Sequence, residues 1–150
     1  MITLNQIITR VQNLISSNVL LSNGSFYFGD PWEYTASQIS GGMKYPFVGC
    51  RLVNSNIGGT DANVFETQLN LFFCDLVHKG EENETEVLSD MLKSCQMFYA
   101  DLVLDLYNLD GTDVSLSSSM TPFTEKFDDE VSGIEMTVTI QQFYNKSTCA

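Results

Sequence analysis

The clearest pattern in the chain lies at its N-terminus, where apolar residues recur every three or four positions. This spacing places them on one face of a helix; they are Leu4, Ile7, Ile8, Val11, Leu14 and Ile15. Thr3 and Gln6 have the spacing of a capping box, in which each side chain bonds the backbone N–H of the other residue. Either the Ser16–Ser17 pair or Asn18 ends the helix. Its apolar face needs a partner surface.

A second and longer helix is predicted in the middle of the chain, after a polar linker at residues 79–86. Its apolar residues again follow helical spacing; they are Val87, Leu88, Met91, Leu92, Cys95, Tyr99, Leu102, Val103 and Leu106. Asn83 or Thr85 can cap its start. Glu84 and Glu86 lie near the positive end of the helix dipole, so helix initiation explains these two acids.

Two segments show the alternation of apolar and polar residues that is typical of half-buried strands. In residues 64–77, one face carries Phe65, Thr67, Leu69, Leu71 and Phe73. In residues 134–144, one face carries Ile134, Met136, Val138 and Ile140. This pattern indicates an antiparallel sheet that is covered on a single side. From Phe72 onward the second face of the first segment also becomes apolar, so this end is predicted to be covered twice or to touch another subunit.

Shorter extended segments and the connections between them complete the pattern. Strands are predicted at residues 26–28, 47–54 and 123–127, the last of them after a break at Thr121–Pro122. Glycine, serine and aspartate are frequent in residues 55–63 and 110–119, which are expected to be connections, the second with a few extended residues. A turn is expected at residues 128–133, where Asp128, Asp129 and Glu130 precede Gly133.

The order of these elements favours an α+β domain over a parallel α/β domain, because runs of strands do not alternate strictly with helices. We expect a mainly antiparallel sheet of four to five strands, with two helices packed on one face. The chain shows neither an internal repeat nor a second domain. Residues 1–150 are therefore expected to form one domain, which also suits the length of the chain.

The charge of the chain restricts its partners. Acidic residues number 19 against 7 basic ones, which gives a net charge of -12. The bases are scattered singly through the chain; they are Arg10, Lys44, Arg51, Lys79, Lys93, Lys126 and Lys146. Nucleic-acid and anionic lipid surfaces require clustered bases, so direct binding to either is not expected. A bilayer-spanning segment and a signal peptide are not expected either, because the apolar residues near the N-terminus form no compact block.

Residues that could support catalysis or bind a metal are sparse. His78 is the only histidine and has no neighbouring Ser or Cys signature, so a Ser-His-Asp or Cys-His system is not expected. The four cysteines have no CxxC spacing. Cys50, Cys74 and Cys95 are predicted to be small buried hydrophobic residues rather than zinc ligands or disulfide partners. No enzymatic activity, cofactor or metal is therefore expected.

The densest polar cluster is Glu-Lys-Phe-Asp-Asp-Glu at residues 125–130. Its position favours a solvated turn or a contact between subunits. Its carboxylates could also hold Ca²⁺ or Mg²⁺, which take oxygen ligands, or act as a catalytic pair, although the spacing does not match an EF-hand loop. The candidate subunit-interface residues are Phe72, Leu76, Phe123, Lys126, Phe127, Asp128 and Asp129.

Three segments carry a resemblance to known viral proteins. They are Asp75–Val77, Glu86–Asp90 and the segment Thr-Pro-Phe-Thr-Glu-Lys-Phe-Asp-Asp-Glu-Val-Ser-Gly at residues 121–133. These segments resemble small virion proteins of phages and prophages of Bacteroides-type bacteria, including crAss-like phages. In size and element order the chain also resembles the tail-terminator and tail-completion proteins of tailed bacteriophages. Those proteins fold as a sheet flanked by helices and assemble into hexameric or dodecameric rings.

The resemblance implies a structural virion protein that forms a ring in the neck or tail and acts in head–tail joining or tail completion. Its partners would be copies of itself and other neck or tail ring proteins or the portal. Viral DNA would pass through the lumen without specific binding, and an acidic wall would let it slide. Assembly would take place in the cytoplasm of the host bacterium, and the protein would be located in the virion.

A second hypothesis also accounts for the acidic composition. The chain could be a soluble adaptor or a DNA mimic that inhibits a host nucleic-acid-binding protein. A DNA mimic requires acids that are aligned in rows. Here many acids lie at predicted turns and helix starts, which favours the ring protein.

Overall fold

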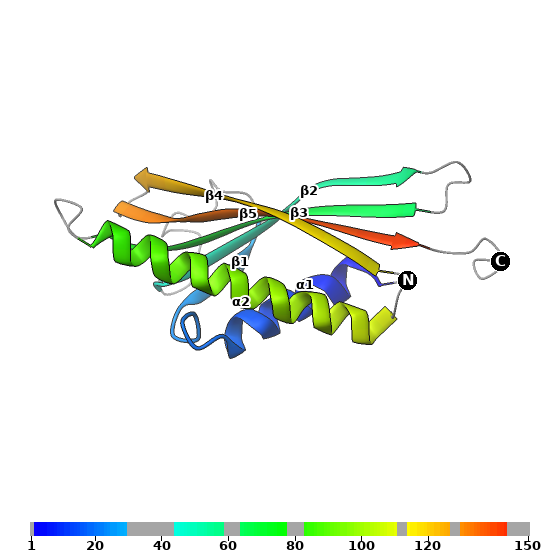
Figure 1. Cartoon of the computed structure of the whole chain (residues 1–150), viewed down its shortest axis with the longest axis horizontal. Helices are drawn as coiled ribbons and strands as arrows, with labels where there is room; N and C mark the ends of the chain where they lie inside the picture. The colour runs from blue at the N-terminus through cyan, green and yellow to red at the C-terminus, as the bar shows by residue number, and fades with distance from the viewer. Residues whose placement is uncertain are drawn as a thin grey trace.

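The computed structural model describes residues 2–29, 44–58, 64–77, 83–110, 114–126 and 130–143. The elements in chain order are α1 (Leu4–Ser17), β1 (Ser25–Phe28), β2 (Phe47–Gly58), β3 (Val64–Leu76), α2 (Glu84–Asp110), β4 (Val114–Lys126) and β5 (Glu130–Phe143). Both helices lie on the same face of one sheet (Figure 1). The predicted α+β class, with a mainly antiparallel sheet and two helices on one face, is confirmed.

The five strands form a single sheet in the order β1-β2-β3-β5-β4. β1 pairs with β2 in parallel, whereas the other three pairs are antiparallel. β3 and β5 are neighbours over their length, from Val64 opposite Phe143 to Leu76 opposite Val131. The β4–β5 hairpin therefore places β5 inside the sheet, next to the central strand β3, and leaves β4 at its edge.

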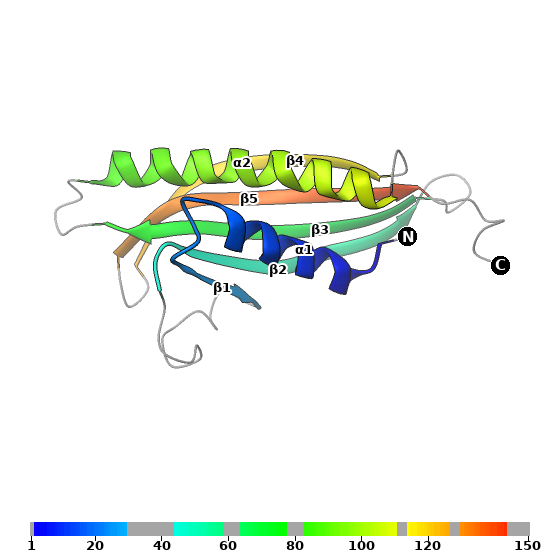
Figure 2. The same ribbon diagram turned by 90° about the horizontal axis from the view of Figure 1, so that it is seen from below.

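The two helices bury the apolar face of the sheet. Figure 2 shows α2 running along β5 and β4, with α1 beside it across β3 and β2. The alternating residues of β3 and β5 that face the helices are fully buried; they are Leu69, Leu71, Phe73, Met136, Val138 and Ile140. Phe98 of α2 packs on Phe73, with the ring centroids 5.5 Å apart. Because burial of one such side chain contributes about 1.5–3 kcal/mol, this layer is the main hydrophobic core.

Hydrogen bonds at the start of α1 hold the N-terminal residues against the sheet. The Thr3 hydroxyl accepts from the backbone N–H of Gln6 at 3.3 Å, and the Gln6 side-chain oxygen accepts from the Thr3 N–H at 2.8 Å. The predicted capping box is therefore confirmed. The buried Gln142 side chain of β5 accepts from the Ile2 N–H at 2.6 Å and donates to the Ile2 carbonyl at 3.1 Å. These two bonds tie the start of α1 to β5.

α2 begins at Glu84, the position that a cap at Asn83 predicts, and three residues before its apolar stripe starts at Val87. The carbonyl of Asn83 accepts from the Val87 N–H at 3.0 Å, so Asn83 immediately precedes the first turn. The Glu84 side chain accepts hydrogen bonds from the hydroxyls of Thr124 at 2.8 Å and Ser132 at 3.3 Å. The polar first turn is thus held by contacts with β4 and β5, which the spacing of apolar residues does not reveal.

Two segments that the sequence predicts to be connections belong to strands. The loop prediction for residues 55–63 is wrong at 55–58, where β2 continues opposite β3. The prediction for residues 110–119 is wrong from Val114 onward, and no break occurs at Thr121–Pro122. β4 is continuous because β5 pairs with it along its length. Residues 59–63 and 111–113 lie outside the described residues.

The predicted turn before the last strand is also too long, because β5 begins at Glu130 rather than Ile134. Gly133 lies inside β5, opposite Cys74 of β3 and Phe123 of β4. A Cβ atom at this position would come within 1.9 Å of the Phe73 carbonyl oxygen. Glycine is therefore required here by the close approach of two strands, not by a turn.

Candidate interaction surfaces

β4 forms one edge of the sheet, because it pairs with β5 on one side and with no described residue on the other. Its residues 114–121, Val-Ser-Leu-Ser-Ser-Ser-Met-Thr, include no charged side chain. Natural edge strands are commonly protected from further pairing by charges, bulges or proline. Here Pro122, which has no backbone N–H to donate, follows directly after this uncharged part. The edge at residues 114–121 is thus open to another strand.

A second open edge lies on the opposite side of the sheet, along the far half of β2. β1 pairs with β2 only from Phe47 to Cys50. From Arg51 to Gly58, β2 pairs with β3 alone among the described residues, and its side chains from Leu52 onward are exposed. Arg51 is the one charged residue of this half. Both open edges are therefore similar in length and almost without charge.

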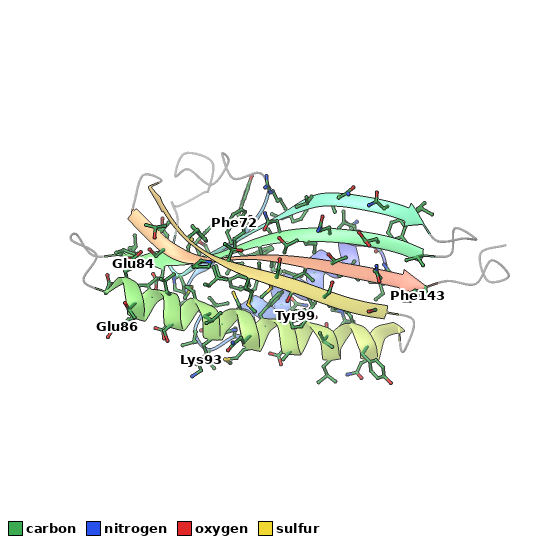
Figure 3. All side chains as sticks on the ribbon, turned by 45° about the horizontal axis from the view of Figure 1, so that its top comes forward. Phe72, Glu84, Glu86, Lys93, Tyr99 and Phe143 are labelled. Atoms are coloured by element: carbon green, nitrogen blue, oxygen red, sulfur yellow. The ribbon has the colours of Figure 1, made fainter. Side chains whose placement is uncertain are left out.

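The flank of α2 beside β4 carries a row of apolar side chains. Leu88 and Leu92 line a shallow groove together with Met120 of β4, which places them on this flank. Three further residues continue the row at helical spacing; they are Tyr99, Val103 and Tyr107. Figure 3 shows Tyr99 on the side of α2 that faces β4. Tyr107 is 52% exposed, so the row remains accessible toward the end of the helix.

A larger apolar groove lies under the start of α1, next to the open half of β2. Its volume is about 470 Å³, and it is lined by Ile2, Thr3, Leu4, Leu52, Ser55, Phe65 and Thr67. None of these side chains is charged. Beyond the groove on the same side of β2, Ile57 is 64% exposed. The helix-facing side of the β2–β3 pair is therefore covered incompletely at this end.

The opposite face of the sheet is polar, and neither helix covers it (Figure 1). The register places hydroxyl and amide side chains along it; they are Gln68, Ser115, Ser117, Ser119, Thr121, Thr137, Thr139 and Gln141. Its two described acids are hydrogen-bonded to amides: Asn70 donates to Glu135 at 2.9 Å, and Gln141 donates to Glu66 at 3.0 Å. The Oδ1 atom of the buried Asn70 side chain has no hydrogen-bond partner.

Phe72 and Phe123, two of the predicted interface residues, pack against each other on this polar face. Their ring centroids are 5.9 Å apart and the rings are nearly perpendicular, at 87°. They lie against a small second cluster that consists of Phe47, Cys74 and Val131. This cluster explains within one chain why both faces of β3 become apolar from Phe72 onward. Leu76, at the end of β3, is 41% exposed.

The structure says less about the other predicted interface residues. Lys126 ends β4 opposite Glu130, the first residue of β5. Phe127, Asp128 and Asp129 lie outside the described residues, as does His78. A turn, a subunit contact and a metal site at residues 125–130 therefore stay predictions. Among the described residues, no three His, Cys, Asp or Glu side chains are grouped as a metal site.

Four acids of α2 lie away from the apolar flank beside β4. Helical spacing groups Glu86, Asp90, Asp101 and Asp105 on the remaining sides of the helix. Asp105 accepts a hydrogen bond from Arg10 of α1 at 3.1 Å, which identifies the side that faces α1. Figure 3 shows Glu86 and Lys93 pointing away from the sheet. These four acids are thus separated from the apolar flank of α2, and Arg51 is the one charged residue of the two open edges.

The three described cysteines are buried, as predicted. Burial raises the pKa of the Cys50 thiol to about 12. Burial, and secondarily the charge of Asp75, raises the pKa of the Cys74 thiol to about 12. Burial also raises the pKa of Cys95. All three thiols are therefore protonated at neutral pH, and a protonated thiol is a poor nucleophile and metal ligand.

Sequence reasoning identified neither open edge. A signal for the first exists at residues 114–121, where Val114, Leu116 and Met120 alternate with polar residues. The second has no sequence signal, because it depends on the point at which β1 stops pairing with β2. The groove under α1 likewise depends on how far the helix extends over the sheet.

Comparison with known proteins identifies no family for this chain. No protein-family model matches it, and no curated protein matches its sequence. Among the described residues, no helix has both the length and the apolar character needed to cross a membrane. The interaction surfaces of the structure are thus the basis for a functional proposal.

Proposed function

We propose that this protein is a structural virion protein that forms a ring in the neck or tail of a tailed bacteriophage. There it acts in head–tail joining or tail completion around the DNA channel. The observation that carries the proposal is the pair of open, nearly uncharged edges on opposite sides of one sheet. A chain with two different contact surfaces can assemble head to tail, and contacts of this kind generate rings when the rotation between copies closes.

Because the net charge of the chain is -12, contacts between copies depend on where the acids lie relative to these edges. Copies of an acidic chain repel one another, and the repulsion is strongest where acids would be brought face to face. Glu86, Asp90, Asp101 and Asp105 of α2 lie on other sides of the helix than its flank beside β4, and Glu84 is hydrogen-bonded within the chain to Thr124 and Ser132. Copies that meet through the two edges therefore avoid the closest contacts between acids.

The described surface also supports passage of DNA without specific binding. A phosphate backbone is bound by clustered Lys and Arg side chains. Arg10 is paired with Asp105, and Arg51 lies over the Phe72 ring at 6.0 Å from its centroid. The other two cations with a described side chain lie on different elements, Lys44 before β2 and Lys93 on α2, where it points away from the sheet. Among the described residues, no row of cations is thus available to phosphates on either face of the sheet.

Mass measurement and negative-stain imaging of the purified chain test this proposal. We expect rings of six or twelve copies, formed by the chain alone or with its portal or tail partner. Because repulsion between acidic copies is screened by salt, the ring population should rise between low and physiological ionic strength, as the Debye length falls from about 30 to about 8 Å. A chain that stays monomeric under all these conditions and joins neither partner contradicts the proposal.

The same measurement separates the ring protein from an acidic adaptor or DNA mimic. A DNA mimic would remain a monomer or dimer and would bind a basic host protein. That complex would dissociate as salt is added, because its affinity comes from charge. Salt is therefore expected to act in opposite directions on the two candidate functions.

A further inference from the structure

We propose that β4 of one copy adds to the open half of β2 in the next copy, so that the two sheets become continuous. The inference rests on the proposed ring, since it names the surfaces through which the copies join. The partner is a second copy of this chain, because no described strand pairs with either edge and each edge can supply the strand that the other lacks. Four observations support this pairing. They are the strand directions, the side-chain register, the limits of both edges and the position of the apolar groove.

Strand direction is the first argument. β2 and β5 run in one direction, and β3 and β4 run in the other. When neighbouring copies are related by rotation about a ring axis, β4 of one copy therefore approaches β2 of the next in the antiparallel sense. Antiparallel pairing is also the arrangement of the other three pairs between β2 and β4 within one chain. No strand has to be reversed to extend the sheet.

Side-chain register is the second argument. A continuous sheet keeps each side chain on its own face, so helix-facing residues must meet helix-facing residues. Leu116 and Met120 are two apolar residues on the helix-facing side of β4 in this edge. Leu52 and Ile57 are the corresponding residues of β2, which has a register shift between Leu52 and Asn54.

One register satisfies both apolar pairs at once. It places Leu116 opposite Ile57 and Met120 opposite Leu52 of the next copy. On the polar face, it places serines of β4 opposite asparagines of β2; the pairs are Ser117 with Asn56 and Ser119 with Asn54. Cross-strand pairs of matched character contribute about 0.2–1 kcal/mol each relative to alanine pairs.

The limits of the two edges coincide in this register. It places Thr121 opposite Arg51, and the next pair would be Pro122 with Cys50. Cys50 is where β1 already pairs with β2. Pro122 is where β4 can no longer donate a backbone hydrogen bond. In this register, the run of backbone N–H donors in β4 therefore ends at the same pair of residues as the unpaired edge of β2.

The helices provide a second layer to the same contact. The sheet extension brings the last turns of α2 in one copy toward the groove under α1 in the next. This groove is lined by apolar residues such as Ile2 and Phe65. Val103 is 37% exposed, and helical spacing places it beside Tyr99 on the flank of α2 that faces β4. Apolar side chains would thus fill an apolar groove, and Asp101 and Asp105, which lie on other sides of α2, would stay outside the contact.

Disulfide cross-linking tests the register. In a Cys149→Ser background, we combine Ser117→Cys with Asn56→Cys, which replaces two exposed side chains. Within one chain these positions lie on strands that are three spacings apart, about 14 Å, whereas a disulfide requires Cα atoms within about 7 Å. Any cross-link must therefore join two copies. The buried native thiols are protonated and should not interfere.

We expect mild oxidation of the double variant to give a ladder of covalent multimers that ends at the size of the ring. Three controls should give no ladder: each single cysteine variant, and the pair Thr121→Cys with Asn56→Cys, which is four residues, about 13 Å, out of register. Cross-linked dimers from Ser117→Cys alone would indicate two-fold pairing of β4 with β4 and would overturn the inference.

The remaining outcomes separate the inference from the proposed function. Rings that form without the Ser117–Asn56 cross-link overturn the edge pairing and leave the ring intact. Absence of both rings and cross-links overturns both.

A charge substitution tests the same contact without cysteines. Ile57→Glu places a carboxylate at a position that the register buries against Leu116, so we expect loss of the ring population. Val19→Glu is the matched control, since Val19 is 80% exposed and lies outside both edges. Circular dichroism should show that both variants fold. Rings that persist in folded Ile57→Glu, with the same abundance as in Val19→Glu, contradict the inference.

Discussion

The two faces of the sheet are formed by the same strands, yet different interactions hold their side chains. Under the helices, large apolar side chains of β3 and β5 are fully buried against α1 and α2. On the other face, hydroxyls, amides and hydrogen-bonded carboxylates cover most of the strands, and one small aromatic cluster surrounds Phe72 and Phe123. The comparison teaches that one face carries most of the hydrophobic stabilisation. The second face and the edges can therefore be polar or open without loss of the fold.

The largest expected effect comes from the centre of the helix-covered face. Phe98→Ala removes a fully buried ring that packs on Phe73, so it should lower the free energy of unfolding by about 3–5 kcal/mol. Ser119→Ala, on an exposed position of the other face, should change it by less than about 0.5 kcal/mol. Urea denaturation followed by circular dichroism measures both. Similar losses for the two variants would contradict the division of stability between the faces.

An intermediate effect is expected where the polar face contains a buried group. Glu135→Ala removes the acceptor of the Asn70 amide, whose Oδ1 already lacks a partner. Leaving a buried polar group unsatisfied costs about 1–3 kcal/mol, and the free energy of unfolding should fall by that amount. Glu135→Gln retains an acceptor oxygen and is the matched control, with a smaller expected loss. Equal losses in the two variants would show that charge, and not the hydrogen bond, matters here.

The buried thiols show how well each face of the sheet excludes water, because their burial makes the stability of the chain depend on pH. Cys50 lies under the helices and Cys74 lies in the aromatic cluster of the other face. Burial raises the pKa of both thiols from 9.0 to about 12, so the folded chain keeps these protons at a pH where the unfolded chain loses them. The resulting stability is complete below pH 9 and is lost as pH rises toward 12.

At pH 10 the expected loss is about 1.4 kcal/mol for each thiol. Denaturation measured between pH 8 and pH 10.5 tests this, with Cys50→Ala and Cys74→Ala as paired variants. Each variant lacks one thiol, so its free energy of unfolding should fall by about 1.4 kcal/mol less at pH 10 than that of the original chain. This difference should hold whatever the stability of the variant at neutral pH. If only Cys50→Ala reduces the slope, water reaches the aromatic cluster and the two faces differ more than the structure indicates.

The smallest expected effect is local to the start of α1. Thr3→Ala removes the N-cap hydroxyl that accepts from Gln6, and loss of such a cap costs about 1 kcal/mol. Thr9→Ala, at an exposed position within α1, should be neutral or slightly stabilising because alanine favours the helix interior. Thermal unfolding compares the two. A cost for Thr9→Ala as large as that for Thr3→Ala would mean that the capping box contributes little.

Elements with a periodic hydrophobic pattern could be predicted from the sequence. The capping box, the apolar stripes of both helices and the alternation in β3 and β5 each depend on residues that are close in the chain. The burial of three cysteines also follows from composition and spacing. Together these features were sufficient for the α+β class with two helices on one face of the sheet.

The elements that sequence reasoning missed depend on partners that are distant in the chain. The serine-rich β4 has few apolar residues, and its extended form depends on pairing with β5 over its length. The hydrogen bonds that Thr124 and Ser132 donate to Glu84 in the first turn of α2 likewise have no signal in the sequence. Gly133 signals a turn in the sequence, although it is required by contact between two strands.

The sequence by itself determined that this is an acidic α+β domain with one well-packed face and no clustered bases. Tertiary structure alone decided which strands lie at the edges, where β1 stops covering β2 and where the groove under α1 remains open. The physical reason is that hydrophobic periodicity reports the surface that each element buries within one chain. Open edges are a property of sheet order, which arises only when distant strands have paired.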